Sequence, residues 1–250
     1  DIDGDVLTFT ADAGSDATVS IDENNNLTIT PNGDYNGTFT VTAQVSDGLL
    51  SSESISFAVV VNPVNDAPIL GDISAQSIEE DTSLVLTLSS TDIDVDDTPT
   101  YEASIDGNAS VSVSVDQLTV TPDLNFNGDI SVTVLVTDNG GLSDSQVFIL
   151  TVNAVNDAPT IESISDQIMD EDLTLGIELF GNDIDGDVLT FTADADDNSS
   201  VSVVDNVVLI TPIANYNGSL TITVHVSDGD LSDSTTFDVV VSPVNDAPIL

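Results

Sequence analysis

Apolar and polar residues alternate along three similar segments of the chain. The segments read GTFTVTAQVSDG at residues 37–48, GDISVTVLVTDNG at residues 128–140 and GSLTITVHVSDG at residues 218–229. Successive side chains of a strand point to opposite faces of the sheet, whereas one face of a helix recurs every three or four residues. The period of two therefore predicts strands with one buried face, and no helical period is found anywhere in the sequence.

Three further segments carry the same alternation, and each has a phenylalanine in the same slot: Phe57, Phe148 and Phe237. Together with shorter runs between clusters of Gly, Asn, Asp and Pro, they give about seven short strands in roughly every 90 residues. Seven alternating strands in that length are typical of an immunoglobulin-like sandwich. We therefore expect an all-β protein made of tandem immunoglobulin-like Greek-key β-sandwiches.

The chain also contains repeated sequence motifs. VNDAP stands at residues 64–68, 155–159 and 244–248, and the letters DIDGDVLTFTADA at residues 1–13 return unchanged at residues 183–195. Markers that recur in one register indicate tandem structural repeats. We expect the first repeat to lack its first two strands, which would leave apolar surface and a sheet edge unpaired. The predicted boundaries are a partial repeat at 1–66 and complete repeats at 67–157 and 158–248.

An aromatic residue stands in the turn N-[YF]-N-G before the sixth strand of each repeat. It is Tyr35, Phe126 and Tyr216 in turn. In an immunoglobulin-like sandwich a tyrosine here can bond its hydroxyl to nearby backbone, a bond that Phe126 cannot make. The alternative is an aromatic ring that simply closes one end of the core.

The charge balance is extreme. The sequence holds 45 Asp and Glu residues, no Lys or Arg and one His, for a formal net charge of −45. Each carboxylate must therefore be hydrated, hydrogen-bonded to backbone N–H groups or bound to a metal ion. Nucleic acid and anionic membrane surfaces are excluded as partners, because phosphate contacts need Lys and Arg. The absence of Cys excludes disulfides, and no apolar run approaches the ~20 residues of a membrane-spanning helix.

The acidic residues gather where successive repeats meet. In the expected topology the loops after the second and sixth strands share one end of a sandwich, and the end of the first strand shares the other end with the outgoing linker. The first junction would then combine Asn65, Asp66, Asp92, Asp94 and Asp138. The second would combine Glu80, Asn156, Asp157, Asp183, Asp185 and Asp228. The third acid of the repeated phrase could be either a metal ligand or only a turn residue. It is Asp5, Asp96 and Asp187 in the three repeats.

Crowded carboxylates without a counterion repel one another. Calcium takes 6–8 oxygen ligands from carboxylates, amides and carbonyls, which is the donor set found here. Zinc and copper are poor candidates without His or Cys, and magnesium is the second choice because of its stricter geometry. The alternative is that Asp-x-Asp forms a solvated turn. Its recurrence with the other acids at fixed offsets favours calcium.

The sequence EEDTSLVLTLSSTDID at residues 79–94, followed by TD at 137–138 and TVNAVNDAPT at 151–160, resembles cadherin repeats. More closely, it looks like the cadherin-like tandem repeats of large bacterial surface adhesins. The resemblance implies calcium bound between successive domains by the residues of the two junctions. It also implies two open half-sites, made of Asp1, Asp3 and Asp47 at one end and Glu171, Asn245 and Asp246 at the other. The sequence departs from cadherins at the turn GDYNG, where Asp34 could substitute weakly for missing acidic ligands.

These observations predict a calcium-rigidified stalk segment of a secreted or cell-surface bacterial adhesin, with a structural role in adhesion or biofilm. The expected partners are adjacent repeats of the same chain. Two alternatives remain: a subunit of an extracellular filament completed by strand exchange between copies, and a module that binds surface polysaccharide. We expect no enzyme activity, because no His–Asp pair supports a nucleophile and acids repeated at every junction are more often structural than catalytic.

Overall fold

The computed structural model describes residues 4–95 and 97–247. Within these residues the chain forms strands, turns and loops, with no helix, so no described helix could cross a membrane. Backbone contacts group the chain into two compact units. The first contains Asp1–Gln76, Ser83–Thr121 and Asp129–Leu150, and the second contains Ser77–Thr82, Pro122–Gly128 and Thr151–Leu250.

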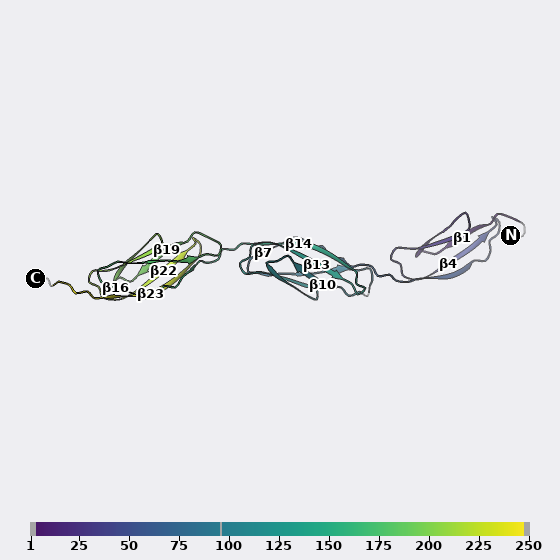
Figure 1. The fold of residues 1–250 in the computed structure, drawn as a ribbon. Coiled ribbons are helices and arrows are strands. Elements are labelled where there is room, and N and C mark those ends of the chain that lie inside the picture. Colours follow the sequence, from purple (N-terminus) through teal and green to yellow (C-terminus); the bar gives the residue numbers. More distant parts are fainter. Residues whose placement is uncertain (1–3, 96, 248–250) are drawn as a thin grey trace. The chain divides into compact units, whose positions relative to one another are not determined.

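The first repeat lies wholly in the first unit. Its described part has two sheets with the strand orders β1-β4-β5 and β2-β3, all antiparallel (Figure 1). The strands are β1 (Thr8–Asp12), β2 (Ala17–Ile21), β3 (Leu27–Pro31), β4 (Gly37–Ser46) and β5 (Ile55–Val61). They correspond to the last five strands of the predicted sandwich.

The second repeat forms sheets with the orders β10-β13-β14-β7, β11-β12-β8 and β6-β9. The long strand β14 continues from the first unit into the second, where most of β7 also belongs. The strands are β6 (Ile69–Leu70), β7 (Gln76–Glu79), β8 (Leu84–Thr87), β9 (Ser90–Thr91), β10 (Thr100–Ile105), β11 (Ala109–Ser114), β12 (Gln117–Pro122), β13 (Gly128–Thr137) and β14 (Ser143–Asn153).

The third repeat lies in the second unit and has the same sheet orders, β16-β23-β22-β19, β17-β21-β20 and β15-β18. Strand β16 pairs parallel to β23, and β17 pairs antiparallel to β21. The strands are β15 (Thr160–Ile161), β16 (Gln167–Asp170), β17 (Leu175–Glu178), β18 (Gly181–Asn182), β19 (Thr190–Ala195), β20 (Ser199–Val204), β21 (Val207–Pro212), β22 (Gly218–Ser227) and β23 (Ser232–Ser242).

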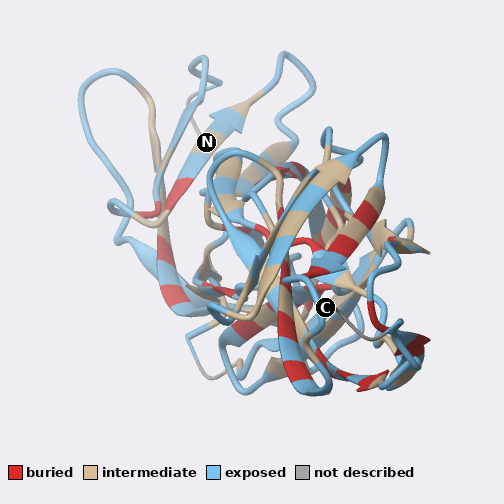
Figure 2. Cartoon of the chain, turned by 90° about the vertical axis from the view of Figure 1, so that its left-hand side faces the viewer, coloured by how far each residue is buried: buried red, intermediate tan, exposed pale blue. Residues whose placement is uncertain are grey.

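The alternating pattern produces the core as predicted. Along β22 the side chains of Leu220, Ile222, Val224 and Val226 are fully buried, and their counterparts along β13 are too. Buried and exposed bands alternate along the strands (Figure 2). The prediction of an all-β protein of tandem immunoglobulin-like sandwiches is confirmed.

The number of strands differs from the prediction of about seven for each complete repeat. The first two strands are each split, because the chain changes its hydrogen-bonding partner partway along. In the third repeat, β15 pairs with β18, whereas β16 pairs with β23 and β17 with β21. A change of partner interrupts the ladder and divides the strand.

The aromatic turn is held by Tyr216 in the third repeat. Its hydroxyl donates a hydrogen bond to the backbone oxygen of Ser219 over 3.0 Å. The turn needs positive φ at Asn215 and Gly218, and a Cβ at Gly218 would lie 2.9 Å from the Tyr216 hydroxyl oxygen. The ring of Phe126 lies beside Gly128 in the same way. The ring therefore lies against the turn glycine in both repeats, and the tyrosine adds one hydrogen bond.

Replacing Tyr216 with Phe should weaken the start of β22. One neutral hydrogen bond contributes about 1 kcal/mol, so amide hydrogens in β22 should exchange about fivefold faster. Hydrogen-exchange mass spectrometry measures this. The reverse change, Phe126→Tyr, should slow exchange at the start of β13. Unchanged exchange in both variants would show that only the ring matters.

Candidate metal centre

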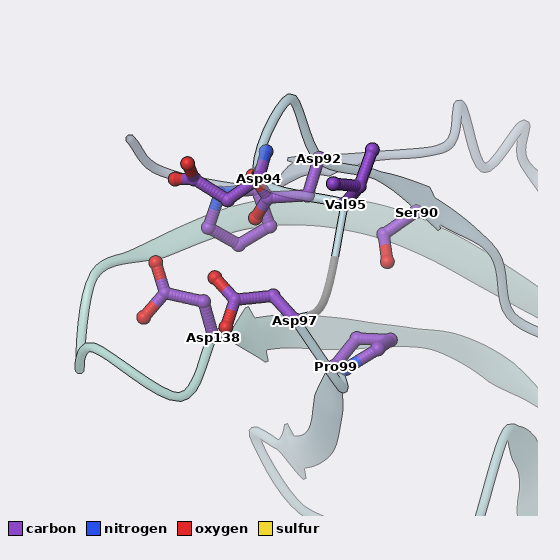
Figure 3. A pocket seen from close by; sticks show the side chains of 8 residues that line it. Ser90, Asp92, Asp94, Val95, Asp97, Pro99 and Asp138 are labelled. Atoms are coloured by element: carbon purple, nitrogen blue, oxygen red, sulfur yellow. Dashed lines mark hydrogen bonds between the residues drawn. The ribbon is translucent and has the colours of Figure 1, made fainter. Parts of the chain in front are cut away.

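The first junction gathers four carboxylates from two loops of the second repeat. Asp92, Asp94 and Asp97 lie in the segment between β9 and β10, and Asp138 directly follows β13. All four line a pocket of about 270 Å³ (Figure 3). One carboxylate oxygen from each of Asp92, Asp94 and Asp97 lies within 4.8 Å of the others. The predicted meeting of these two loops at one end of the sandwich is therefore found.

The linker from the first repeat bonds directly to these carboxylates. The side-chain amide of Asn65 donates to Asp138 Oδ2 over 2.8 Å, and the backbone N–H of Asp66 donates to Asp94 Oδ2 over 2.9 Å. The backbone N–H of Asp94 in turn donates to Asp92 Oδ1. All five residues predicted for the first junction thus belong to one hydrogen-bonded group.

The second junction repeats these bonds with different residues. Asn156 donates to Asp228 Oδ2 over 2.9 Å, and the backbone N–H of Asp157 donates to Asp185 Oδ2 over 2.8 Å. The backbone N–H of Asp185 donates to Asp183 Oδ1 over 2.9 Å. The same geometry therefore arises twice from residues about 90 positions apart.

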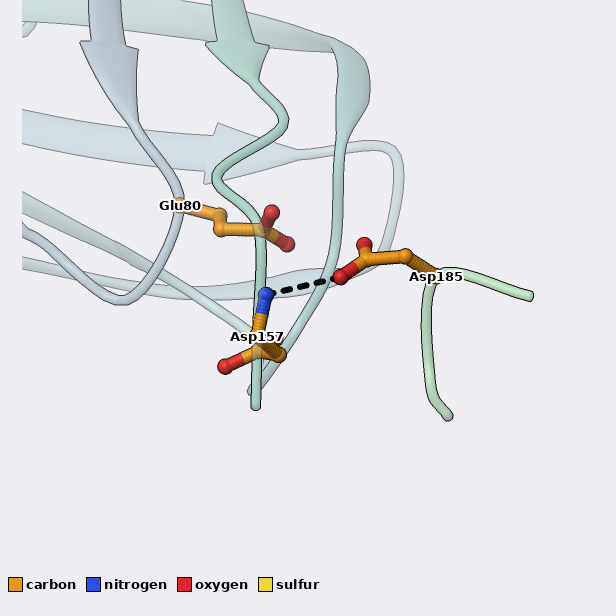
Figure 4. Close-up of side chains that lie close together, drawn as sticks. All are labelled: Glu80, Asp157 and Asp185. Carbon is orange, nitrogen blue, oxygen red and sulfur yellow. Dashed lines mark hydrogen bonds between the residues drawn. The ribbon is translucent and has the colours of Figure 1, made fainter. Parts of the chain in front are cut away.

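Glu80 adds a buried carboxylate to the second junction. It follows β7, its side chain is only 4% exposed, and Oε1 accepts the backbone N–H of Val155. Figure 4 shows Glu80 beside Asp157 and Asp185, and one oxygen from each of the three lies within 4.8 Å of the others. Asp185 also forms a second such group with Asp183 and Asp187, so its carboxylate is shared by two clusters.

Several oxygens in these clusters are buried without a hydrogen-bond partner. They include Oδ2 of Asp92, Asp157 and Asp183. Burial raises the pKa of Asp157, and the nearby negative charges of Asp185, Asp81, Glu80 and Asp183 raise it further. A buried carboxylate oxygen without a partner is costly. The sequence has no Lys or Arg to pair with them, and Nε2 of His225, its one histidine, lies 3.3 Å from Oδ2 of Asp194, which is outside these clusters.

The aspartate after the sixth strand of each repeat also accepts hydrogen bonds from backbone N–H groups of its own loop. Asp228 Oδ1 accepts the backbone N–H groups of Asp230 and Leu231, each over 2.7 Å. The bond from Asn156, followed by these backbone bonds, lowers the pKa of Asp228. Asp47 likewise accepts from Leu50 and Leu49, which lowers its pKa. One oxygen thus holds the loop, and in the two junctions the other receives the linker.

The predicted half-sites are placed only in part. Asp1 and Asp3 lie outside the described residues, as does Asp96, whereas Asp47 lies in its own loop. At the other end, Glu171 is 6% exposed and accepts the backbone N–H of Val244, while its Oε2 is buried without a partner. Asn245 and Asp246 follow on the exposed linker.

Sequence reasoning missed Asp97. The repeated phrase is degenerate in the second repeat, where it reads DIDVDD. Asp96 was considered as a possible ligand from the sequence, and Asp97 was not. The adjacent pair of acids was the available signal. Asp34, which the sequence suggested as a weak substitute, lines a hollow of about 210 Å³ with Asp66 and Asp94.

Replacing Asp97 with Asn should weaken metal binding at the first junction only. The change removes one of four negative charges around the pocket and keeps the side-chain volume. We expect a fall in calcium affinity of about tenfold at that junction, measured by isothermal titration calorimetry. Unaltered affinity would remove Asp97 from the site.

Sequence comparison places the repeats in known families. Residues 65–151 and 156–240 match the bacterial Ig domain family, and residues 1–62 match the cadherin-like domain family. The chain belongs to the bacterial Ig domain family. No curated protein matches the sequence of this bacterial Ig chain.

Solved structures similar to this bacterial Ig chain include cadherin repeats. Protocadherin gamma B2 extracellular domains 1–5 give a TM-score of 0.56 at 20% identity over 96% of the chain. Mouse cadherin-23 domains EC22–24 give 0.56 at 20% over 95%, and the protocadherin gammaB7 EC3–6 cis-dimer structure gives 0.54 at 20% over 94%. The chain spans 53%, 86% and 64% of these structures respectively. At this identity the likeness shows the fold.

The family supplies a general assignment. Bacterial Ig and cadherin-like repeats are typical of extracellular and surface proteins, where they serve as structural rather than enzymatic modules. Cadherin-like domains generally bind calcium, and the clusters of this bacterial Ig chain contain the oxygen donors that such binding needs.

Proposed function

We propose that this chain is a calcium-rigidified stalk segment of a large bacterial surface adhesin, acting in adhesion or biofilm formation outside the cell. The observation that carries the proposal is the set of buried, unpaired carboxylate oxygens at both junctions, in a chain without Lys or Arg. Such oxygens need a hydrogen-bond donor or a cation, and the described residues place neither beside them.

The donor chemistry at the junctions fits calcium. Asp92, Asp94, Asp97 and Asp138 would hold it at the first junction, and Glu80, Asp157, Asp183 and Asp185 at the second, with Asp187 as a further donor. Bound calcium would supply the positive charge that these carboxylates lack. Two carboxylates 4 Å apart repel by roughly 4 kcal/mol at an effective dielectric constant of 20, so crowding several of them favours a divalent ion.

The linkers explain why binding would stiffen the chain. Asn65 and Asp66 already hydrogen-bond to Asp138 and Asp94, and Asn156 and Asp157 bond to Asp228 and Asp185. Neutralising these carboxylates removes the repulsion that opposes the linker contacts. Extracellular calcium modules bind with Kd of about 10⁻⁴–10⁻³ M, so sites of this class fill outside a cell and empty in the cytosol.

Small-angle X-ray scattering with calcium and with a chelator tests this function. With calcium we expect a larger radius of gyration and a larger maximum dimension, because the linkers are fixed. Magnesium at the same concentration and sodium chloride at matched ionic strength are the controls, since screening alone acts on all 45 acids. Identical profiles in calcium and chelator would refute the proposal.

A further inference from the structure

The loop between β13 and β14 is one residue longer than its counterpart in the third repeat. It reads DNGGL at residues 138–142, whereas the loop between β22 and β23 reads DGDL at residues 228–231. Both loops begin with the aspartate that accepts the side-chain amide of the linker asparagine. The loop of the first junction therefore contains an Asn–Gly pair, Asn139–Gly140, and the loop of the second does not.

An asparagine followed by glycine can lose its side-chain amide without an enzyme. The backbone nitrogen of the glycine attacks Cγ of the asparagine, the Cγ–Nδ2 bond breaks, and the amide leaves as ammonia with the proton of the backbone nitrogen. Water then opens the resulting cyclic imide at either of its two carbonyl carbons. Glycine favours the attack because it has no Cβ to shield its nitrogen and adopts backbone conformations that other residues avoid.

The chain contains five Asn–Gly pairs, and the fold restrains four of them. In three pairs the glycine is the first residue of a strand and lies against the aromatic ring of its turn: Gly37 of β4, Gly128 of β13 and Gly218 of β22. In the fourth pair, the side chain of Asn32 donates to the backbone oxygen of Ser15 over 2.6 Å. Asn139 is exposed in its loop, and its side chain has no hydrogen-bond partner among the described residues. Asn139 is therefore the least restrained of the five.

Gly140 lies in contact with the linker from the first repeat. A Cβ at Gly140 would overlap the side-chain amide of Asn65, which donates to Asp138 Oδ2 over 2.8 Å. In the third repeat, a Cβ at Gly229 would have no described atom within 4 Å. The bond between Asn65 and Asp138 therefore depends on where the backbone of Gly140 lies.

We propose that Asn139–Gly140 is a modification site, where spontaneous deamidation releases Asn65 from Asp138 and loosens the first junction with time. Opening of the imide at the backbone carbonyl carbon gives isoaspartate, whose main chain is longer by a methylene group. The lengthened loop moves Gly140 against Asn65. Opening at the side-chain carbonyl carbon gives aspartate, which adds a negative charge directly after Asp138.

The second junction keeps its linker under the same conditions. There the glycine follows Asp228 itself, whose carboxylate accepts the amide of Asn156 and the backbone N–H groups of its own loop. A charged carboxylate is a poorer target for a nitrogen nucleophile than a neutral amide. The reaction at Asn139 uses only the loop, the linker and water, so the inference stands whether or not calcium binds.

Ageing of the 250-residue chain in mildly alkaline buffer, followed by peptide mapping with mass spectrometry, tests the site. We expect Asn139 to be converted at least about tenfold faster than the other four Asn–Gly asparagines, because an exposed loop opens at a lower free energy than a strand. Tandem mass spectra distinguish isoaspartate from aspartate. Equal rates at all five pairs, or a faster reaction at one of the other four, would overturn the proposal.

Hydrogen exchange at residues 64–67 measures the release, because the backbone N–H of Asp66 donates to Asp94 in the same group. We expect exchange about fivefold faster in the aged chain than in the fresh chain. An aged Asn139→Gln variant, which keeps the amide but closes the ring slowly, should show no change.

Two glycine variants separate the contact from the chemistry. Gly140→Ala should speed exchange at residues 64–67 without ageing, because its Cβ displaces Asn65. Gly33→Ala is the matched control, since a Cβ there would have no described atom within 4 Å, and it should leave this exchange unchanged. An aged chain with Asn139 converted but exchange at residues 64–67 unaltered would show that the linker is not released.

Discussion

Adding calcium to the metal-free chain is expected to raise its melting temperature by about 10–20 °C. A ligand at 100 times its Kd adds about 2.7 kcal/mol per site to the free energy of unfolding, and 1 kcal/mol shifts the melting temperature of a domain of this size by about 4–8 °C. The physical reason is the removal of repulsion among the clustered carboxylates. Asp92 and Asp183, for example, are half-buried, and their Oδ2 atoms are buried without a partner. Circular dichroism melting curves with and without chelator measure the shift.

Screening must be separated from binding in this experiment. A chain of net charge −45 is stabilised by any salt that weakens its self-repulsion. Sodium chloride at matched ionic strength measures the contribution of screening. Magnesium tests whether the stabilisation is specific to calcium. Equal shifts with sodium chloride and calcium would mean that the clusters are solvated surface and would contradict the metal site.

Replacing Asp185 with Asn should abolish most calcium binding at the second junction and leave the first unchanged. Asp185 is the one residue shared by the cluster with Glu80 and Asp157 and the cluster with Asp183 and Asp187, among the clusters that the described residues form. Loss of its charge should lower the calcium affinity of that junction at least about 100-fold. Isothermal titration calorimetry should then show one set of sites in place of two.

The same variant should have the opposite effect in chelator. The charge of Asp185 helps to raise the pKa of Asp157, so removing it relieves repulsion in the metal-free junction, and the third repeat should melt at a slightly higher temperature. The asparagine still accepts the Asp157 backbone N–H. A structural role alone would instead lower stability under both conditions.

Two matched variants complete the comparison. Asp94→Asn should remove calcium from the first junction alone, because Asp94 there takes the place of Asp185. Asp116→Asn changes an exposed acid outside the clusters and should bind calcium as the parent chain does. Loss of binding at both junctions from either junction variant would show that the sites are not separate.

Much of the site could be predicted because it repeats. Asn65 with Asp138 and Asn156 with Asp228 form the same hydrogen bond, and the fixed offsets among the acids indicated that such groups belong together. Asp97 was missed because sequence spacing alone does not say which of two neighbouring acids turns toward the pocket. Loop conformation decides that, and loop conformation depends on contacts with the rest of the sandwich.

The fold class, the repeat and most of the acids that gather at the junctions follow from the amino-acid sequence. The alternating pattern places every second side chain of β13 and β22 in the core. The recurring sequence motifs show which positions of the three repeats are equivalent. The folded chain sets three further properties: where strands break, which carboxylate oxygens are buried without partners, and which sheet edges in the described part of the first repeat lack a neighbouring strand. These properties arise from contacts between segments distant in the chain: a strand breaks when its partner changes, and an oxygen is left unpaired only when other segments cover it.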